Sequence, residues 1–326
     1  MLRYTPADGP EADSDPRTGD RVPAAPSAVF ASRPGVRPAG RRGPAPVAWL
    51  VLPTLLLFAV FFALPFGVMA LLSLTTDNPL VAPDAALTVR HYRRLVGDAY
   101  HFEVLATTVR LGLLTTLAAL GLGYPLAHLM ARMRSRLGHA LLLMAVLAPL
   151  LTGVVVRTYA WMTLLSDQGV INSVLTGLGL TRRPLRLMYN EFGIVVALVH
   201  IYVPFMVLTL SGVIARIDPR LEEAARNLGA GRLRAFREVT LPLSLPGILA
   251  GSLLVFALAI SAYVTPILMG GFQVMTLPIL VYQQVSASFN LGFASALGLV
   301  LLVVSIGLVV AYHRVLGRLA GQPELA

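Results

Sequence analysis

The chain alternates between long apolar stretches and shorter polar segments that are rich in arginine. Six apolar stretches are long enough to cross roughly 30 Å of hydrocarbon as helices, which takes about 20 residues each. No Asp, Glu, Lys or Arg occurs from Val239 to His313, which suits a bilayer better than a water-facing fold. We therefore predict an all-α integral membrane protein with six transmembrane helices, placed at about 46–74, 105–131, 138–164, 192–215, 247–269 and 292–313.

The segments outside these helices complete the predicted domain organisation. Residues 1–45 are rich in Pro, Ala, Gly and Arg without apolar periodicity, which predicts a disordered cytoplasmic tail. The tail is too long and too polar for a simple signal peptide, so the first span is expected to be retained. A transmembrane domain then covers 46–318, followed by a short cytoplasmic tail at 319–326. The apolar segment Val274–Tyr282 is too short to span and is expected to be interfacial or re-entrant.

The distribution of arginine predicts the orientation of the chain in the membrane. Six spans place both termini on one side, and that side collects 18 of the 26 arginines. Basic residues accumulate in the cytoplasmic loops of membrane proteins. We therefore expect both termini and the loop 216–245 to be cytoplasmic, in a multi-pass membrane protein.

Composition excludes several kinds of chemistry. Only 13% of the residues are charged, against about 25% in an ordinary soluble domain, and the placement of the net charge of +10 along membrane-flanking loops argues against a nucleic-acid partner. The absence of cysteine excludes thiolate metal sites, and the absence of lysine excludes a phosphate-binding loop with its lysine. The six histidines show no metal-ligand spacing. We expect no catalytic residue, metal or cofactor in this chain, so that ATP and Mg, if used, bind a partner chain.

The cytoplasmic loop 216–245 carries the strongest local pattern. Asp218 followed by Pro219 predicts a helix start, and Gly229 predicts its end. One face of this helix is an apolar stripe with helical spacing, formed by Leu221, Ala224, Ala225 and Leu228. A second short helix is expected to stop at Leu241-Pro242. Such a projecting stripe predicts a docking element for a groove on a partner; the alternative is an amphipathic loop that lies on the membrane.

The same loop resembles the EAA loop of binding-protein-dependent ABC importer permeases. The resemblance rests on Glu223-Ala224-Ala225, then Gly229, Val239 and Leu241-Pro242 at fixed spacing, with Val239 where that family usually has isoleucine. It implies a type I ABC importer architecture in which this loop forms the coupling helix that fits the ATP-binding subunit. The residues implied in coupling are Leu221, Glu223, Ala224, Ala225, Leu228, Gly229, Leu241 and Pro242.

The resemblance covers roughly residues 50–317 and extends to the spermidine/putrescine permease subunits. The matching stretches are Gly123–Ala127, Val156–Trp161, Gly169–Ser173, Val203–Val207 and Tyr263–Pro266. The resemblance implies import of a polyamine by alternating access. It also implies a location in a bacterial inner membrane. Two departures from the family pattern are Ser261-Ala262 before the last stretch and the run Phe272–Pro278 after Gly271. In addition, the six spans contain no Asp or Glu that could pair with a polyamine. The alternatives are another small solute, such as an amino-acid-like compound or a chelated metal, or a secondary transporter driven by an ion gradient.

The resemblance also implies partners and a pathway. The expected partners are two ATP-binding subunits, a second permease subunit in a heterodimer or a copy of this chain, an extracytoplasmic solute-binding protein and the lipid bilayer. The candidate pathway residues are Arg157, Tyr159, Trp161, Tyr202, Tyr263 and Pro266. The alternatives are that the aromatic residues form an interfacial belt, that Arg157 snorkels to the outer interface as Arg110 does, and that Pro266 only kinks its helix.

Overall fold

The computed structural model describes residues 45–76 and 86–319 of the chain. The predicted tails therefore lie almost wholly outside the described residues. By its internal contacts the chain divides into residues 1–56 and 57–326, and the boundary falls inside the first helix. The regular secondary structure of the described residues is helical, apart from one isolated antiparallel bridge between Thr75 and Leu87.

Four helices are long and apolar enough to cross a membrane by themselves. They are α1 (Ala45–Ser73), α3 (Ala99–Arg132), α7 (Glu191–Ile214) and α14 (Leu291–Leu319). Each covers one of the predicted spans. The number of spans rises to six when each of two bent helix pairs is also counted as one.

The first bent pair replaces the continuous helix expected at 138–164. Helix α4 (Arg136–Leu147) and the 3₁₀ turn η1 (Ala148–Leu151) meet α5 (Val154–Leu165) and α6 (Val170–Gly177) at a bend of 98°. Thr152 and Gly153 both have extended backbone, with ψ of 141° and 148°. Two extended residues in succession end one helix and start another, so the span predicted at 138–164, in which Pro149 was expected to produce a kink, is broken by a sharp bend.

The second bent pair belongs to the last third of the chain. The short helices α9 (Arg232–Ala235), η2 (Phe236–Thr240, a π turn) and α10 (Leu241–Leu243) meet α11 (Leu245–Ser261) at 63°. The helix expected at 247–269 is also interrupted, because Ala262 is extended and α12 (Val264–Gly270) follows as a separate helix. Helix α13 (Leu277–Ser286) has ten residues, too few to span a bilayer, as the sequence indicated.

Helices α3, α7 and α11 pack on one another and form the main core. Their contacts depend on glycine, because a Cβ added at Gly123 would lie 2.9 Å from Cγ of Met206, and one at Gly251 would lie 2.8 Å from its Sδ. Small residues that admit a neighbouring helix are the usual device of membrane helix packing. Fully buried side chains of α7, among them Leu210 and Ile214, fill the space between the three helices.

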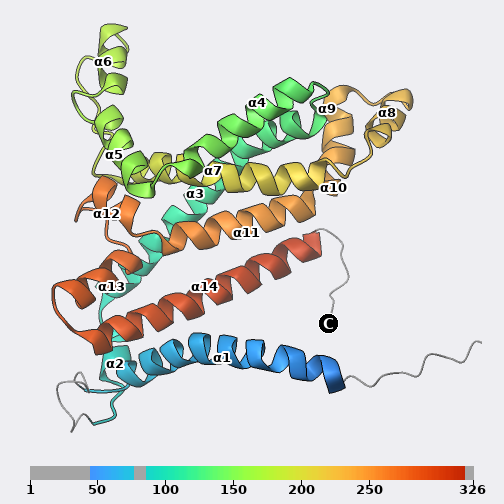
Figure 1. Cartoon of the computed structure of the whole chain (residues 1–326). Helices are drawn as coiled ribbons and strands as arrows, with labels where there is room; N and C mark the ends of the chain where they lie inside the picture. The colour runs from blue at the N-terminus through green and yellow to red at the C-terminus, as the bar shows by residue number, and fades with distance from the viewer. Residues whose placement is uncertain (1–44, 77–85, 320–326) are drawn as a thin grey trace, which may run out of the picture. The chain divides into compact units, whose positions relative to one another are not determined.

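The short helices gather at opposite ends of these long ones (Figure 1). Helix α8 (Pro219–Asn227) lies with α9 and α10 at one end, whereas α5, α6, α12 and α13 lie at the other end. The fold therefore separates the coupling loop predicted from the sequence from the segments that carry most of the candidate pathway residues.

Candidate coupling surface and pathway segments

The backbone of the loop 216–245 follows the local signals in its sequence. Asp218 caps α8, because its Oδ1 accepts a hydrogen bond from the backbone N–H of Arg220 at 2.9 Å, and Pro219 occupies the first turn. The helix ends before Gly229, whose φ of +92° is a conformation that favours glycine. The helix start and end predicted from Asp218, Pro219 and Gly229 are confirmed.

The apolar stripe of α8 faces away from the rest of the chain. Leu221 is 47% exposed and Leu228 is 90% exposed. Glu223 and Ala224 are also exposed, and Ala225 is half-buried. An apolar stripe that the chain itself leaves uncovered is typical of a surface that another protein contacts.

A partly buried ion pair holds the other side of α8. Nη2 of Arg132, at the end of α3, donates to Oε1 of Glu222 at 2.9 Å, and the hydroxyl of Thr240 donates to the same oxygen. Nη1 of Arg132 also donates to the backbone carbonyl of Ile217 at 2.9 Å, directly before the helix. Arg132 therefore attaches both the start of α8 and its first turn to a transmembrane helix.

The environment of Glu222 keeps its carboxylate ionised. Partial burial raises the pKa of Glu222, but the hydrogen bond from Thr240 and the charge and hydrogen bond of Arg132 outweigh this effect. The pKa of Glu222 consequently lies below its ordinary value of 4.5. The sequence placed Glu222 only in the first turn of the helix, and its role as an anchor was missed, because its partner lies 90 residues away.

The second half of the loop packs on α3. The ring of Phe236 meets Tyr124 and His128 edge to face, with centroids 5.6 and 5.7 Å apart. The hydroxyls of Tyr124 and Ser244 share a hydrogen bond of 2.8 Å. The expected stop at Leu241-Pro242 is wrong, because the chain stays helical through η2 and α10.

Pro242 occupies the first turn of α10, where a missing N–H is tolerated, which explains why the proline does not end the helical stretch. Its side chain is exposed, whereas Leu241 is half-buried and packs against the core.

Four of the six candidate pathway residues fall into two groups. Trp161 on α5 meets His200 on α7 edge to face at 5.5 Å, and Tyr202 of α7 packs on the same apolar cluster as Trp161. Arg157 of α5 is close enough to Tyr202 to interact with it electrostatically. Tyr263, in contrast, stacks on Tyr282 of α13 at 5.6 Å.

The six candidate pathway residues also differ in exposure. Tyr159 and Tyr263 are 54% and 45% exposed, Pro266 is buried, and the hydroxyl of Tyr202 donates to the carbonyl of Leu258 at 3.2 Å. The structure therefore does not gather all six residues around one space.

A polar pocket of about 1080 Å³ lies beside α5. Tyr159 from α5, Asp167 and Arg186 from the segments around α6, Tyr189 before α7 and Gln273 after α12 line it. The pocket lining includes side chains of both signs of charge. No cluster of three metal-ligating side chains occurs in the described part of the chain. The pocket can accept a polar solute or a polar loop of another protein.

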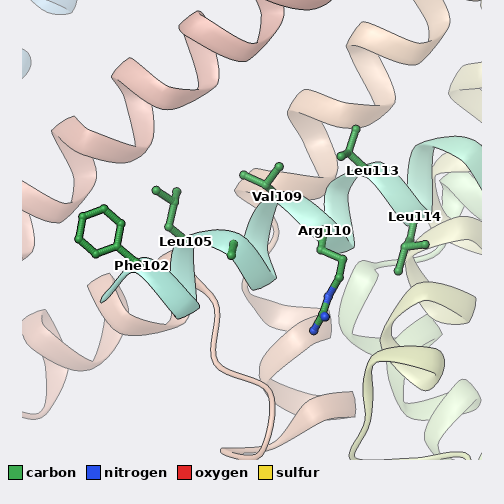
Figure 2. Close-up of a pocket in the computed structure, with 7 residues that line it drawn as sticks. Phe102, Leu105, Val109, Arg110, Leu113 and Leu114 are labelled. Atoms are coloured by element: carbon green, nitrogen blue, oxygen red, sulfur yellow. The ribbon is translucent and has the colours of Figure 1, made fainter. Parts of the chain in front are cut away.

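The exposed face of α3 carries a second, apolar pocket. Figure 2 shows Phe102, Leu105, Val109 and Leu113 spaced along this helix, with Arg110 beside them. Arg110 forms an ion pair with Glu191 at the start of α7, so its charge is satisfied within the chain. The apolar side chains suit contact with lipid or another membrane helix.

Comparison with known proteins identifies the family to which this arrangement belongs. The family model described as "Binding-protein-dependent transport system inner membrane component" matches residues 184–320, which include the coupling loop. The spermidine/putrescine transport system permease protein PotB of Escherichia coli K12 is 33% identical over 279 residues, covering 86% of this chain and 98% of that protein. This chain belongs to the family of binding-protein-dependent ABC importer permeases. PotB of Haemophilus influenzae is 31% identical, covering 85% of this chain and 94% of that protein.

Solved structures share the fold of this permease. A bacterial ABC transporter involved in the import of alginate has a chain with a TM-score of 0.69 at 19% identity, covering 84% of this permease and 96% of that chain. A chain of the MetNI methionine ABC transporter has a TM-score of 0.52 at 16% identity, covering 67% and 95%. The permease is therefore a multi-pass inner membrane protein with the fold of ABC importer permeases.

Proposed function

We propose that this permease subunit imports a polyamine of the spermidine and putrescine type. The support is the identity of 33% to PotB of E. coli across 98% of that protein's length. An alternative small solute is favoured by a probable molybdenum ABC transporter permease of Haloferax volcanii, which is 31% identical over 82% of this chain. The lack of Asp and Glu in the predicted spans also leaves this chain without a carboxylate to pair with a polyamine inside the membrane.

Coupling to ATP hydrolysis is proposed to occur through α8. The observation that carries this proposal is the exposed stripe from Leu221 to Leu228 on a helix that Arg132 holds through Glu222. A groove on each of two ATP-binding subunits would cover such a stripe, one on this chain and one on the second permease subunit. Because Arg132 ends α3, a push on α8 would be transmitted directly to a transmembrane helix.

The proposed mechanism is alternating access. ATP closes the pair of ATP-binding subunits, which brings the coupling helices together and shifts the permease toward its outward-open conformation. An extracytoplasmic solute-binding protein would deliver the polyamine to the outer segments 75–104 and 165–191. One related alginate transporter structure is described as a complex with a periplasmic protein bound to an alginate pentasaccharide. ATP and Mg would bind the partner, and this chain would supply no catalytic group.

Uptake of radiolabelled spermidine and putrescine tests this proposal in native cells that express the tagged permease or lack it. We expect uptake that requires the permease and stops when ATP is depleted while the ion gradient is maintained. Uptake that survives ATP depletion would instead support a secondary transporter. Permease-dependent uptake of molybdate or an amino acid, with no uptake of polyamines, would reject the polyamine and leave the ABC importer class in place.

A further inference from the structure

Arg157 on α5 is a charged side chain that the described part of the chain leaves unsatisfied. Its Nε and Nη1 are buried and have no hydrogen-bond partner among the described residues. The guanidinium is close enough to His200 and Tyr202 of α7 to interact with both electrostatically. Trp161, one turn later on the same side of α5, packs edge to face on His200. Nδ1 of His200 is likewise buried without a partner in the described residues.

The position of this cluster along α7 places it inside the membrane. Helix α7 has 24 residues and starts at Glu191, so it is about 36 Å long, and His200 lies about 14 Å from its start. A side chain that packs beside His200 and Tyr202 is therefore nearer the middle of the span than its outer end. This argues against the interpretation that Arg157 snorkels to the outer interface.

Arg157 is half-buried, but a cation at this depth with two buried nitrogens unpartnered in the described residues still needs a counter-ion, because an unpaired charge inside a membrane is costly and such residues usually pair. Even Arg110, whose side chain is 59% exposed, has a carboxylate partner in the chain, Glu191 at the start of α7. No equivalent partner is available to Arg157, because the six predicted spans contain no Asp or Glu. A second copy of the same chain would have the same spans and would also lack an acidic residue at that depth.

We propose that Arg157 forms an ion pair within the membrane with a carboxylate of a second, non-identical permease subunit. A carboxylate would balance the charge of the guanidinium and accept a hydrogen bond from one of the two nitrogens, Nε or Nη1, that have no partner in the described residues. The partner is thereby specified by its chemistry: a transmembrane helix with Asp or Glu at the depth of His200. This inference rests on the proposed function only in its pairing with another permease subunit, and it does not depend on the solute.

Photo-crosslinking from α5 identifies the helix that approaches Arg157. Ala160 is exposed and lies three residues after Arg157, on the same side of α5. We replace Ala160 with benzoylphenylalanine in the full complex in native membranes, irradiate it and sequence the crosslinked peptide. The expected product is a transmembrane peptide of a different permease chain that contains Asp or Glu. A crosslink to a second copy of this chain, or to a helix without an acidic residue, would overturn the proposal.

Charge reversal then tests the ion pair itself. The measured quantity is the amount of the second permease subunit that co-purifies with the tagged chain. Arg157→Asp should lower this amount roughly tenfold or more, because a buried charge then faces a like charge. Arg157→Gln should also lower it, whereas Arg157→Lys should retain much of it. Replacing the partner's acidic residue with arginine should restore assembly with Arg157→Asp.

A matched control separates this effect from misfolding. Arg110→Asp should be rescued by Glu191→Arg within the same chain, and it should not respond to the change in the partner. Membrane insertion is verified for each variant by protease protection.

Assembly is measured without any solute, so rejection of the polyamine would leave this test intact. Normal assembly of Arg157→Asp and Arg157→Gln would overturn the proposal, even if uptake were lost.

Discussion

The anchor of α8 offers the sharpest test of how the permease would receive the movement of an ATPase. Arg132 and Glu222 are 20% and 28% exposed, so their ion pair is largely shielded from water. Hydrogen bonds to charged groups of this kind contribute about 1.5–3 kcal/mol. The hydroxyl of Thr240 supplies a second hydrogen bond to the same carboxylate. Removal of the carboxylate should therefore loosen the whole first turn of α8.

The perturbation is a double-mutant cycle of Arg132→Ala and Glu222→Ala, with binding of the purified ATP-binding subunit to the permease in nanodiscs as the readout. We expect each single variant to weaken binding about tenfold, which corresponds to about 1.4 kcal/mol. The double variant should be little worse than either single one, giving a coupling energy of about 1–2 kcal/mol. Single effects that simply add, or binding unchanged within about 0.3 kcal/mol, would refute the anchoring role.

The pH dependence of the same anchor follows from the lowered pKa of Glu222. A carboxylate whose pKa is depressed in the folded state stabilises that state above its unfolded pKa, and the contribution is lost as pH falls through the folded value. Hydrogen exchange of the α8 amides should therefore show the same anchor-dependent protection from neutral pH down to the ordinary value of 4.5. The protection should decrease only below that pH, and Glu222→Gln should remove this dependence. Loss of protection well above pH 4.5 would mean that the pKa of Glu222 is not depressed.

Three further predictions concern single positions. Gly229→Val should abolish uptake while membrane insertion persists, because φ at Gly229 is +92°, a conformation that valine rarely adopts. The same change at Gly231, where φ is −65°, should reduce uptake less. Equal uptake by both variants would contradict this prediction. Leu228→Asp should weaken binding of the ATP-binding subunit at least about tenfold without changing the melting temperature of the permease, since Leu228 is exposed; unchanged binding would remove it from the interface. Gly123→Ala should lower that melting temperature, because its Cβ would lie 2.9 Å from a methionine side chain, whereas Gly121→Ala, with nothing within 4 Å, should not.

Local rules predicted the parts of the coupling loop that depend on neighbouring residues. The cap at Asp218, the proline after it and the glycine at position 229 each act within one helical turn, so the bounds of α8 followed from the sequence. The exposure of Leu228 was also expected, because the stripe has no second apolar face to bury it. These features need no knowledge of the rest of the fold.

Features that depend on distant contacts or on backbone geometry were not predictable in the same way. The residues on both sides of the bend at Thr152 and Gly153 are equally apolar. A hydrophobicity pattern therefore cannot reveal the bend. The pair of Arg132 and Glu222 joins residues 90 positions apart, and nothing local distinguishes Arg132 from the other arginines between the predicted spans. The depth of Arg157 became evident only when α5 was seen to pack on α7.

In the proposed mechanism, a separate ATP-binding subunit drives this permease through α8. The most direct measurement is purification of the tagged permease from its native membrane in mild detergent, followed by mass spectrometry of the proteins that co-purify. The account predicts an ATP-binding subunit together with a second permease subunit, and loss of the ATP-binding subunit alone in Leu228→Asp. Absence of any ATP-binding subunit, under conditions that preserve other membrane complexes, would contradict the account.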